Sequence, residues 1–149
     1  MANNECVLTV ITPVLNAGKL LLPTLLSVKE QTASELIKHL IIDGGSLDET
    51  NKIAMDNQWK NLTFISGKDH GIYDAMNRGL HLSSSQFIMF LNAGDILASP
   101  LTIEKFYEAL QKNNFDFYYG NFLIWKKDGN LYRWHKAPPP PEALTWKSF

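Results

Sequence analysis

The sequence has little that would mark a secreted, membrane-spanning or nucleic-acid-binding protein. Cys6 is the only cysteine, so no internal disulfide can form, which fits a reducing compartment. The formal net charge of −1 argues against a general binder of phosphate backbones, and we expect no nucleic-acid partner. No apolar run reaches the length of a membrane span, and the first residues, MANNEC, lack a signal-like segment. We expect a cytoplasmic protein and leave open a place at the inner face of the cytoplasmic membrane.

The best-known nucleotide and hydrolase motifs are also missing. The chain has no G-x-G-x-x-G after its first expected strand, no G-x-x-x-x-G-K-[ST] and no G-x-S-x-G. Its four histidines form no H-x-x-x-H pair and have no cysteine partner, which argues against a zinc site. The metal chemistry that remains is that of carboxylate oxygens, which suit Mg²⁺ or Mn²⁺ shared with substrate phosphates.

What the sequence does contain is an alternation of expected strands and helices. With 149 residues, 45% of them hydrophobic and 19% charged, the chain can bury a core as one globular domain. The alternation predicts an α/β fold with a mostly parallel, Rossmann-like sheet flanked by helices. Strands are expected at 7–11 (stopping at Pro13), 36–42, 62–66 and 87–91, and helices at 19–31, 46–57, after Gly71 and at 99–113.

The expected helix boundaries rest on local signals. Residues 46–49 have the spacing of a capping box, and Ser99-Pro100 is a typical helix start. Pro23 is tolerable only near the first turn of its helix. The helix after Gly71 is predicted from five residues that share one helical face: Ile72, Ala75, Met76, Gly79 and Leu80.

The last part of the chain follows a different pattern. Residues 115–125 and 131–134 flank Asp128-Gly129, a favoured two-residue hairpin turn, so we expect a C-terminal antiparallel β-ribbon. Residues 138–141 are four prolines, for which we expect the extended polyproline form. We therefore expect a single domain over 1–149, with an α/β core at 1–113 and a ribbon with a proline-rich tail at 114–149.

Polar side chains follow each expected strand of the core. Asn16, Asp43, Asp69 and Asp95 all lie at or just after a strand end. Ligands of open α/β sheets bind beyond the carboxyl ends of the strands, so these residues are candidates for one site. Three of the four have a specific structural alternative: Asp43 as the opening of a Gly-Gly turn, Asn16 as a helix cap, and Asp95 as a solvated loop acid.

Four segments together resemble family 2 glycosyltransferases. They are VITPVLN at 10–16, IIDGGSLD at 41–48, DHGIYDAMNRG at 69–79 and FLNAGD at 90–95, and the GIYDAMN run is typical of the bacterial polysaccharide-assembly branch. The resemblance implies the N-terminal donor-binding part of a GT-A fold. It also implies transfer of a sugar, usually with inversion, from a nucleotide diphosphate sugar to a glycan or lipid-linked acceptor. Uridine is the commonest base in the family.

The resemblance also implies roles for individual residues. Thr12, Pro13 and Asn16 would line the nucleotide pocket, and Asp43 would accept a hydrogen bond from the base. Asp69 and the helix after Gly71 would lie near the sugar and phosphates of the donor. Asp95 would bind Mg²⁺ or Mn²⁺ on the diphosphate. The full donor-side set is Thr12, Pro13, Asn16, Asp43, Asp69, Gly71, Asp74, Asn77 and Asn92.

Two departures from the family pattern leave alternatives open. The segment at 92–95 has one acid where the family often has two, and the chain ends at Phe149, where family members usually continue. The resemblance therefore places the acceptor half and the catalytic base beyond Phe149. A non-catalytic nucleotide-sugar- or glycan-binding module is the main alternative. A nucleotidyltransferase is a third, although residues 13–19 match its glycine-rich basic loop poorly. Homo-oligomer formation and peripheral membrane association stay open.

Overall fold

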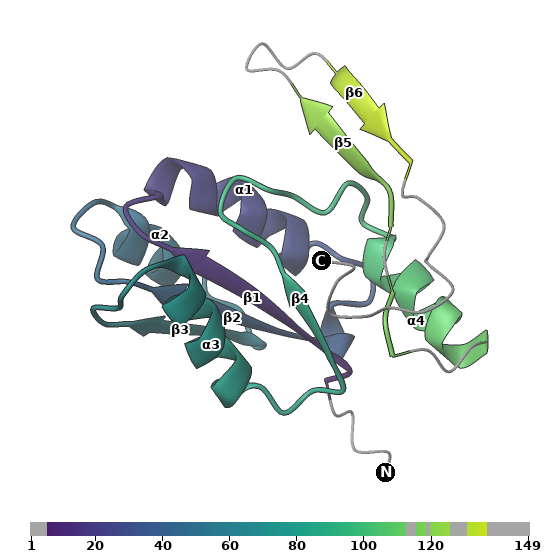
Figure 1. Ribbon diagram of the computed structural model, residues 1–149, viewed down its shortest axis with the longest axis horizontal. Coiled ribbons are helices and arrows are strands. Elements are labelled where there is room, and N and C mark those ends of the chain that lie inside the picture. Colours follow the sequence, from purple (N-terminus) through teal and green to yellow (C-terminus); the bar gives the residue numbers. More distant parts are fainter. Residues whose placement is uncertain (1–5, 113–115, 119, 126–130, 137–149) are drawn as a thin grey trace, which may run out of the picture. The chain divides into compact units, whose positions relative to one another are not determined.

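The computed structural model describes residues 6–112, 116–118, 120–125 and 131–136 of the chain. It divides into two compact units, Met1–Ala109 and Leu110–Phe149. The elements of the first unit alternate in type, as the sequence predicts (Figure 1). In chain order the elements are β1 Leu8–Val14, α1 Gly18–Lys29, the 3-10 helix η1 Ser34–Leu36, β2 Ile37–Asp43, α2 Thr50–Asp56, β3 Leu62–Ser66, α3 Ile72–Leu82, β4 Phe87–Phe90, α4 Thr102–Lys112, β5 Phe122–Trp125 and β6 Leu131–His135.

The first unit is built on a four-stranded sheet in the order β3-β2-β1-β4, and every neighbouring pair is parallel. β1 is central: Leu8 pairs with Ile37 of β2 on one side and with Phe87 of β4 on the other. The expected α/β architecture with a parallel sheet is thus confirmed. The carboxyl ends of all four strands lie at one edge of this sheet. The candidate site residues lie at or just after these strand ends.

Helices cover both faces of the sheet (Figure 1). On one face, Leu21 and Leu25 of α1 pack with Ala54 of α2 against Ile41 and neighbouring strand residues. On the other face, α3 packs through Ala75 onto a cluster formed by Ile11, Leu40 and Ile42. β1 is buried along its whole length, so the central strand has no solvent-facing side, and the hydroxyls of its two threonines, Thr9 and Thr12, have hydrogen-bond partners within the protein.

β1 continues through Pro13, whereas the sequence predicted that the strand stops there. The Ile11 carbonyl accepts a hydrogen bond from Leu91 on the β4 side, and the Val14 carbonyl accepts one from Gly44 on the β2 side. Because these directions alternate along a strand, Pro13 faces the β4 side. β4 pairs only with Leu8–Ile11 and has ended by that point. The missing N–H of Pro13 therefore removes no ladder bond, which is why the strand tolerates it.

Several helix details also differ from the sequence expectation. Pro23 lies inside α1, beyond its first turn. α2 begins at Thr50 with Glu49 at its N-cap position, and the side chain that accepts the Thr50 N–H, at 3.0 Å, is that of Asp48. The expected capping box at 46–49 is wrong, because the N-cap side chain makes no capping hydrogen bond. The buried face of α3 is narrower than the predicted apolar face. Ala75 and Gly79 are buried, but Ile72 and Leu80 are 47% and 41% exposed.

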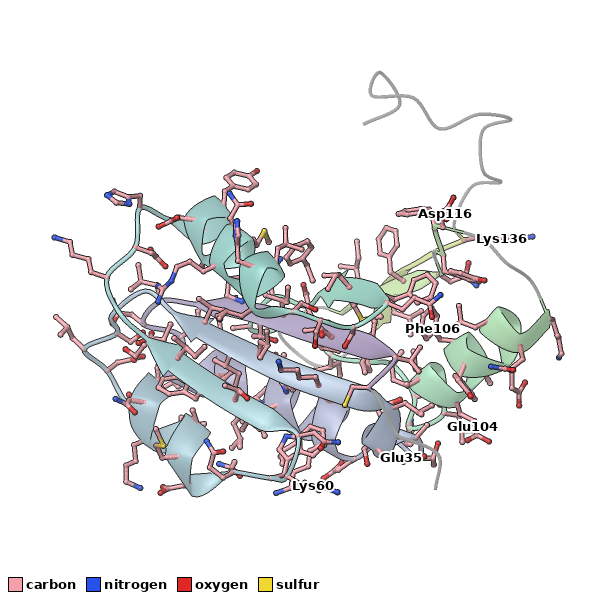
Figure 2. The ribbon with its side chains drawn as sticks, turned by 90° about the horizontal axis from the view of Figure 1, so that it is seen from below. Glu35, Lys60, Glu104, Phe106, Asp116 and Lys136 are labelled. Carbon is pink, nitrogen blue, oxygen red and sulfur yellow. The ribbon has the colours of Figure 1, made fainter. Side chains whose placement is uncertain are left out.

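α4 packs against the end of the sheet where the strands begin. Ser99 precedes it as expected, accepting the Leu101 N–H on its hydroxyl at 3.2 Å, although the helix itself starts at Thr102. Two side chains of α4, Glu104 and Phe106, are labelled in Figure 2. The Phe106 ring meets the Phe87 ring edge-on with centroids 5.6 Å apart, and Glu104 accepts a hydrogen bond from the Thr32 hydroxyl at 2.8 Å.

In the second unit, β5 and β6 form an antiparallel pair in which Phe122 lies opposite His135. The expected Asp128-Gly129 turn and the four prolines lie outside the described residues. Among the helices that the structure describes, none is long and apolar enough to cross a membrane.

Candidate functional site

The strand order places the four polar segments at the same edge of the sheet. Asp69 follows β3, Asp43 ends β2, Asn16 follows β1 and Asp95 follows β4. The convergence expected from the sequence is therefore confirmed for the backbone. β3 and β4 are the two outer strands, so their ends are about 15 Å apart at three strand spacings. A single ligand that touches both ends must be elongated.

At the end of β1, Asn16 joins the β1 and β2 loops. Its backbone is in the left-handed region, with φ 49°, which asparagine tolerates better than most residues. Its N–H donates to the Ser46 hydroxyl at 2.7 Å, and its side-chain oxygen accepts the Leu47 N–H at 2.8 Å. Asn16 is not a helix cap. The N–H groups of Ala17 and Gly18, at the start of α1, instead donate to the Thr50 hydroxyl at the start of α2 and to the Asp48 carboxylate in the loop before it.

At the end of β2, Asp43 is fully buried and organises the turn that follows it. Its carboxylate accepts hydrogen bonds from the N–H groups of Gly45 and Ser46 and from the hydroxyls of Ser46 and Ser66. Ser46 also accepts the Asn16 N–H, so a chain of hydrogen bonds links the ends of β1, β2 and β3. The structural alternative for Asp43, the opening of a Gly-Gly turn, is confirmed.

Asp48 connects the starts of two helices. One carboxylate oxygen accepts the Gly18 N–H at 3.0 Å, and the other accepts the N–H and hydroxyl of Thr50. The Thr50 hydroxyl and then the Gly18 N–H hold the pKa of Asp48 below its ordinary value. The sequence predicts a capping box that includes Ser46, but it does not predict the contacts that Ser46, Asp48 and Ser66 make here. Ser46 and Asp48 lie within a segment that carries the family resemblance, and this was the only signal available.

At the end of β3, the loop to α3 carries the next candidates. Asp69 is partly exposed, and one of its carboxylate oxygens accepts the Gly71 N–H at 3.0 Å. Gly71 has φ 114°, a conformation that favours glycine, and it precedes α3 directly. Asp74 accepts the His70 N–H at 3.1 Å, and this bond is the main cause that lowers the pKa of the Asp74 carboxyl.

Further along α3, Asn77 is exposed and its backbone carbonyl lies 2.7 Å from Nδ1 of His81. Arg78 is partly buried and donates to the Gly67 carbonyl at 2.9 Å. This contact fastens the loop that carries Asp69 to the body of α3.

Thr12 and Pro13 are both buried within β1. The Thr12 hydroxyl lies 2.9 Å from Nε2 of His39 in β2, a side chain that is also fully buried. The Thr12 side chain therefore has a structural partner inside the sheet. A direct donor contact for Thr12 stays a prediction, as it does for Pro13.

At the end of β4, Asn92 and Asp95 are exposed and lie on one tight turn, in which the Asp95 N–H donates to the Asn92 carbonyl at 3.0 Å. Gly94 has φ 99°, and its N–H donates to the Thr24 hydroxyl of α1 at 2.9 Å. The Leu97 N–H donates to the hydroxyl of Ser27 on the same helix. The loop is thus attached along α1, and Asp95 projects from an anchored segment.

Within the described ranges, no group of three or more His, Cys, Asp or Glu side chains gathers to hold a metal ion. Asp95 offers one accessible carboxylate. That donor set fits Mg²⁺ or Mn²⁺ only if substrate phosphates and water complete the coordination, which is how proteins commonly bind Mg²⁺.

The family profile described as glycosyl transferase family 2 matches residues 9–148. The chain belongs to glycosyl transferase family 2. Among curated relatives of this family 2 chain, the "PGL/p-HBAD biosynthesis glycosyltransferase" of Mycobacterium bovis is 32% identical over 133 residues, which cover 87% of this chain and 50% of the relative. "Glycosyltransferase GlyG" of Streptococcus pneumoniae is 27% identical over 131 residues, which cover 84% of this chain and 42% of the relative. The chain spans about half the length of the curated relatives it matches.

Solved structures of similar fold include glycosyltransferases. S. aureus TarS 1-349 in complex with UDP-GlcNAc has a TM-score of 0.66 at 20% identity, over 70% of this chain and 31% of TarS. The mannosyltransferase PcManGT of Pyrobaculum calidifontis, in complex with GDP-Man and Mn²⁺, has a TM-score of 0.59 at 20% identity, over 66% and 30% of the two chains. These likenesses confirm the GT-A fold expected for the family 2 chain.

Proposed function

We propose that this family 2 chain binds a nucleoside diphosphate sugar across the carboxyl edge of its sheet and serves transfer of that sugar to an acceptor. The observation that carries the proposal is the convergence of four strand ends bearing Asn16, Asp43, Asp69 and Asp95 at this edge. An edge about 15 Å long suits an extended ligand with a base at one end and a diphosphate at the other.

The donor we propose is a UDP-sugar. Similar folds were solved with UDP-GlcNAc in TarS and with UDP and Mn²⁺ in glucosyl-3-phosphoglycerate synthase of Mycobacterium tuberculosis, at 20% identity each. The acceptor we propose is a glycan or lipid-linked sugar of surface polysaccharide assembly, with inversion at the transferred carbon. Inverting transfer requires a general base to take the acceptor proton, and no residue of the described edge is assigned to that role.

Asp95 is the residue proposed to hold Mg²⁺ or Mn²⁺ against the diphosphate. Its carboxylate is exposed at the end of β4, and its loop is anchored to α1 through Gly94. When bound, such an ion neutralises the charge that grows on the leaving nucleoside diphosphate. Asn92 lies on the same turn and has an exposed side chain, which gives the phosphates a neutral hydrogen-bond donor.

Asp95→Asn should weaken UDP binding at least about tenfold in the presence of Mn²⁺, because one charge-assisted metal contact is lost. Binding in EDTA should be unchanged. Calorimetry of parent and variant with UDP, with and without Mn²⁺, measures both values. Asp56, an exposed residue of α2, provides the matched control: Asp56→Asn should behave as the parent. Equal Mn²⁺-dependent affinities for parent and Asp95→Asn would remove the metal role.

Transfer itself is tested with UDP-sugar that carries a label on the sugar. Incubation with a bacterial lipid extract should move the label into a lipid-soluble product. UDP binding with no transfer to any supplied glycan or lipid acceptor would favour the alternative, a nucleotide-sugar-binding module.

A further inference from the structure

Two carboxylates lie where β2 and β3 end, and their surroundings differ. Asp43 is fully buried, and its two oxygens accept four different donor groups from Gly45, Ser46 and Ser66. A carboxylate offers about four lone-pair positions in all. The acceptor capacity of Asp43 is therefore used by the protein itself, and a ligand could reach this carboxylate only by opening the turn.

Asp69 is in the opposite state. It is partly exposed, and Oδ1 accepts the Gly71 N–H at 3.0 Å. Among the residues that the structure describes, no donor is hydrogen-bonded to Oδ2. Asp69 thus has an oxygen available for a ligand, and its backbone loop is held by the Arg78 contact to Gly67.

Gly44 makes room for this carboxylate. A Cβ atom on Gly44 would lie 2.8 Å from Oδ2 and 2.9 Å from Oδ1 of Asp69, closer than real Cβ contacts. Gly44 is not among the glycines with a positive φ angle. A glycine is therefore needed here for the space it leaves to Asp69 and not for its backbone conformation. The Asp69 carboxylate consequently lies directly over the backbone turn that Asp43 organises. The Gly67 N–H, bonded to the Asp43 carbonyl at 3.0 Å, joins the two loops.

We propose that Asp69, and not Asp43, reads the base of the donor nucleotide. The inference rests on the proposed function, in which the diphosphate lies near Asp95 on the opposite outer strand, so that the base end of the ligand lies toward β2 and β3. An ionised carboxylate only accepts hydrogen bonds. It pairs with the ring N–H of uracil, thymine or guanine. It repels the ring nitrogen lone pair that cytosine and adenine present at the same place. The donor class is therefore a nucleoside diphosphate sugar whose base carries a ring N–H.

The test compares UDP with CDP, and GDP with ADP, because each pair differs at this ring nitrogen. Calorimetry in the presence of Mn²⁺ should show that, in the pair it binds, the parent binds the nucleotide whose base carries the ring N–H (UDP or GDP) roughly tenfold or more tightly than the other member. Asp69→Asn should abolish or invert that preference, since an amide can donate to the lone pair of cytosine or adenine. Asp56→Asn is the control and should keep the parent preference. The melting temperature of each variant, measured beside the parent, shows that the fold is retained.

The outcomes separate this inference from the proposed function. If the parent binds none of the four nucleoside diphosphates, both the proposed function and the role of Asp69 are lost. If the parent binds both members of a pair equally, donor binding stands and the role of Asp69 is wrong. A preference that survives intact in Asp69→Asn overturns the inference and returns the base contact to Asp43.

Discussion

His39 is an ionisable side chain placed where water does not reach it. It lies in β2, fully buried, with Nε2 2.9 Å from the Thr12 hydroxyl and with Nδ1 lacking any partner in the described part of the chain. Burial lowers the pKa of His39 from 6.5 to about 3. The folded protein therefore keeps this imidazole neutral down to about pH 3, and only the unfolded chain takes up a proton near neutrality.

This difference predicts a loss of stability in mild acid. Below pH 6.5 the unfolded state binds a proton that the folded state excludes until about pH 3, so stability falls as pH falls through this window. The loss attributable to His39 should reach about 2 kcal/mol between pH 8 and pH 5, at about 1.4 kcal/mol per pH unit below 6.5. Urea denaturation of parent and His39→Gln across this range measures it. The same pH slope in both proteins would contradict the prediction.

At the scale of single residues, the sequence indicates which positions belong to the candidate site better than it indicates what each side chain contacts. The family resemblance placed Thr12 in the nucleotide pocket, but it does not state which way the side chain points, and here it points to His39. Asn16 looked like a helix cap because a helix follows it. Its partner Leu47 comes from another loop, which only the folded chain brings close. Asp43 was correctly weighed as a turn residue because Asp-Gly-Gly is a local signal.

At the scale of elements, the contact between α3 and the sheet is set by one glycine. A Cβ atom on Gly79 would lie 2.5 Å from Cγ2 of Ile11, so the helix can approach β1 this closely only without a side chain there. The sequence predicted a wide apolar face for α3. The close approach narrows the buried strip to Ala75 and Gly79, and Ile72 and Leu80 remain partly exposed at its sides. The spacing of apolar residues indicates which side of a helix faces the core, but it does not indicate how many residues on that side become buried.

Gly79→Ala should therefore destabilise the protein by about 1–3 kcal/mol through overpacking, although alanine is the better helix former by roughly 1 kcal/mol. Chemical denaturation measures the change. Gly67→Ala is the matched control, since its Cβ would have only an ordinary contact, 3.5 Å from Arg78 Nη2. The Gly79→Ala cost should shrink in an Ile11→Ala background. An unchanged or raised stability of Gly79→Ala alone would show that α3 shifts to accept the methyl group.

At the scale of the whole molecule, the alternation of strands and helices was enough to predict a parallel sheet, because parallel strands need crossover connections. The order β3-β2-β1-β4 was not predicted, because the sequence of a single strand does not show which other strand it pairs with. The candidate site was found because every strand of a parallel sheet ends at the same edge. The division of roles along that edge, between a saturated Asp43 and an available Asp69, required the three-dimensional contacts.

Binding of UDP with Mn²⁺ should slow amide hydrogen exchange at this one edge. The expected segments are 15–18, 43–50, 66–71 and 91–95, which follow the four strands of the sheet. Amides there that exchange by global unfolding should gain about 2.7 kcal/mol of protection at a ligand concentration one hundred times Kd. Exchange measured by mass spectrometry, with Mn²⁺ alone as the control, locates the effect. Protection centred on the opposite edge, at 57–61 and 83–86, would place the ligand elsewhere.

The pairing of β1 with β4 also bears on how the site comes into being during folding. β1 is first in the chain, yet Leu8 pairs with Phe87, and two strands, three α-helices and one 3-10 helix lie between β1 and β4 in the sequence. Closing so long a loop is entropically costly and slow compared with local helix formation. The pairing of β2 with β3 joins segments nearer to each other in the sequence, so we expect it to form before β1 pairs with β4 and positions the loop of Asp95. A nucleoside diphosphate would thus bind only a chain whose central strand has gained both neighbours, and metal-dependent binding would serve as a kinetic marker for completion of the sheet.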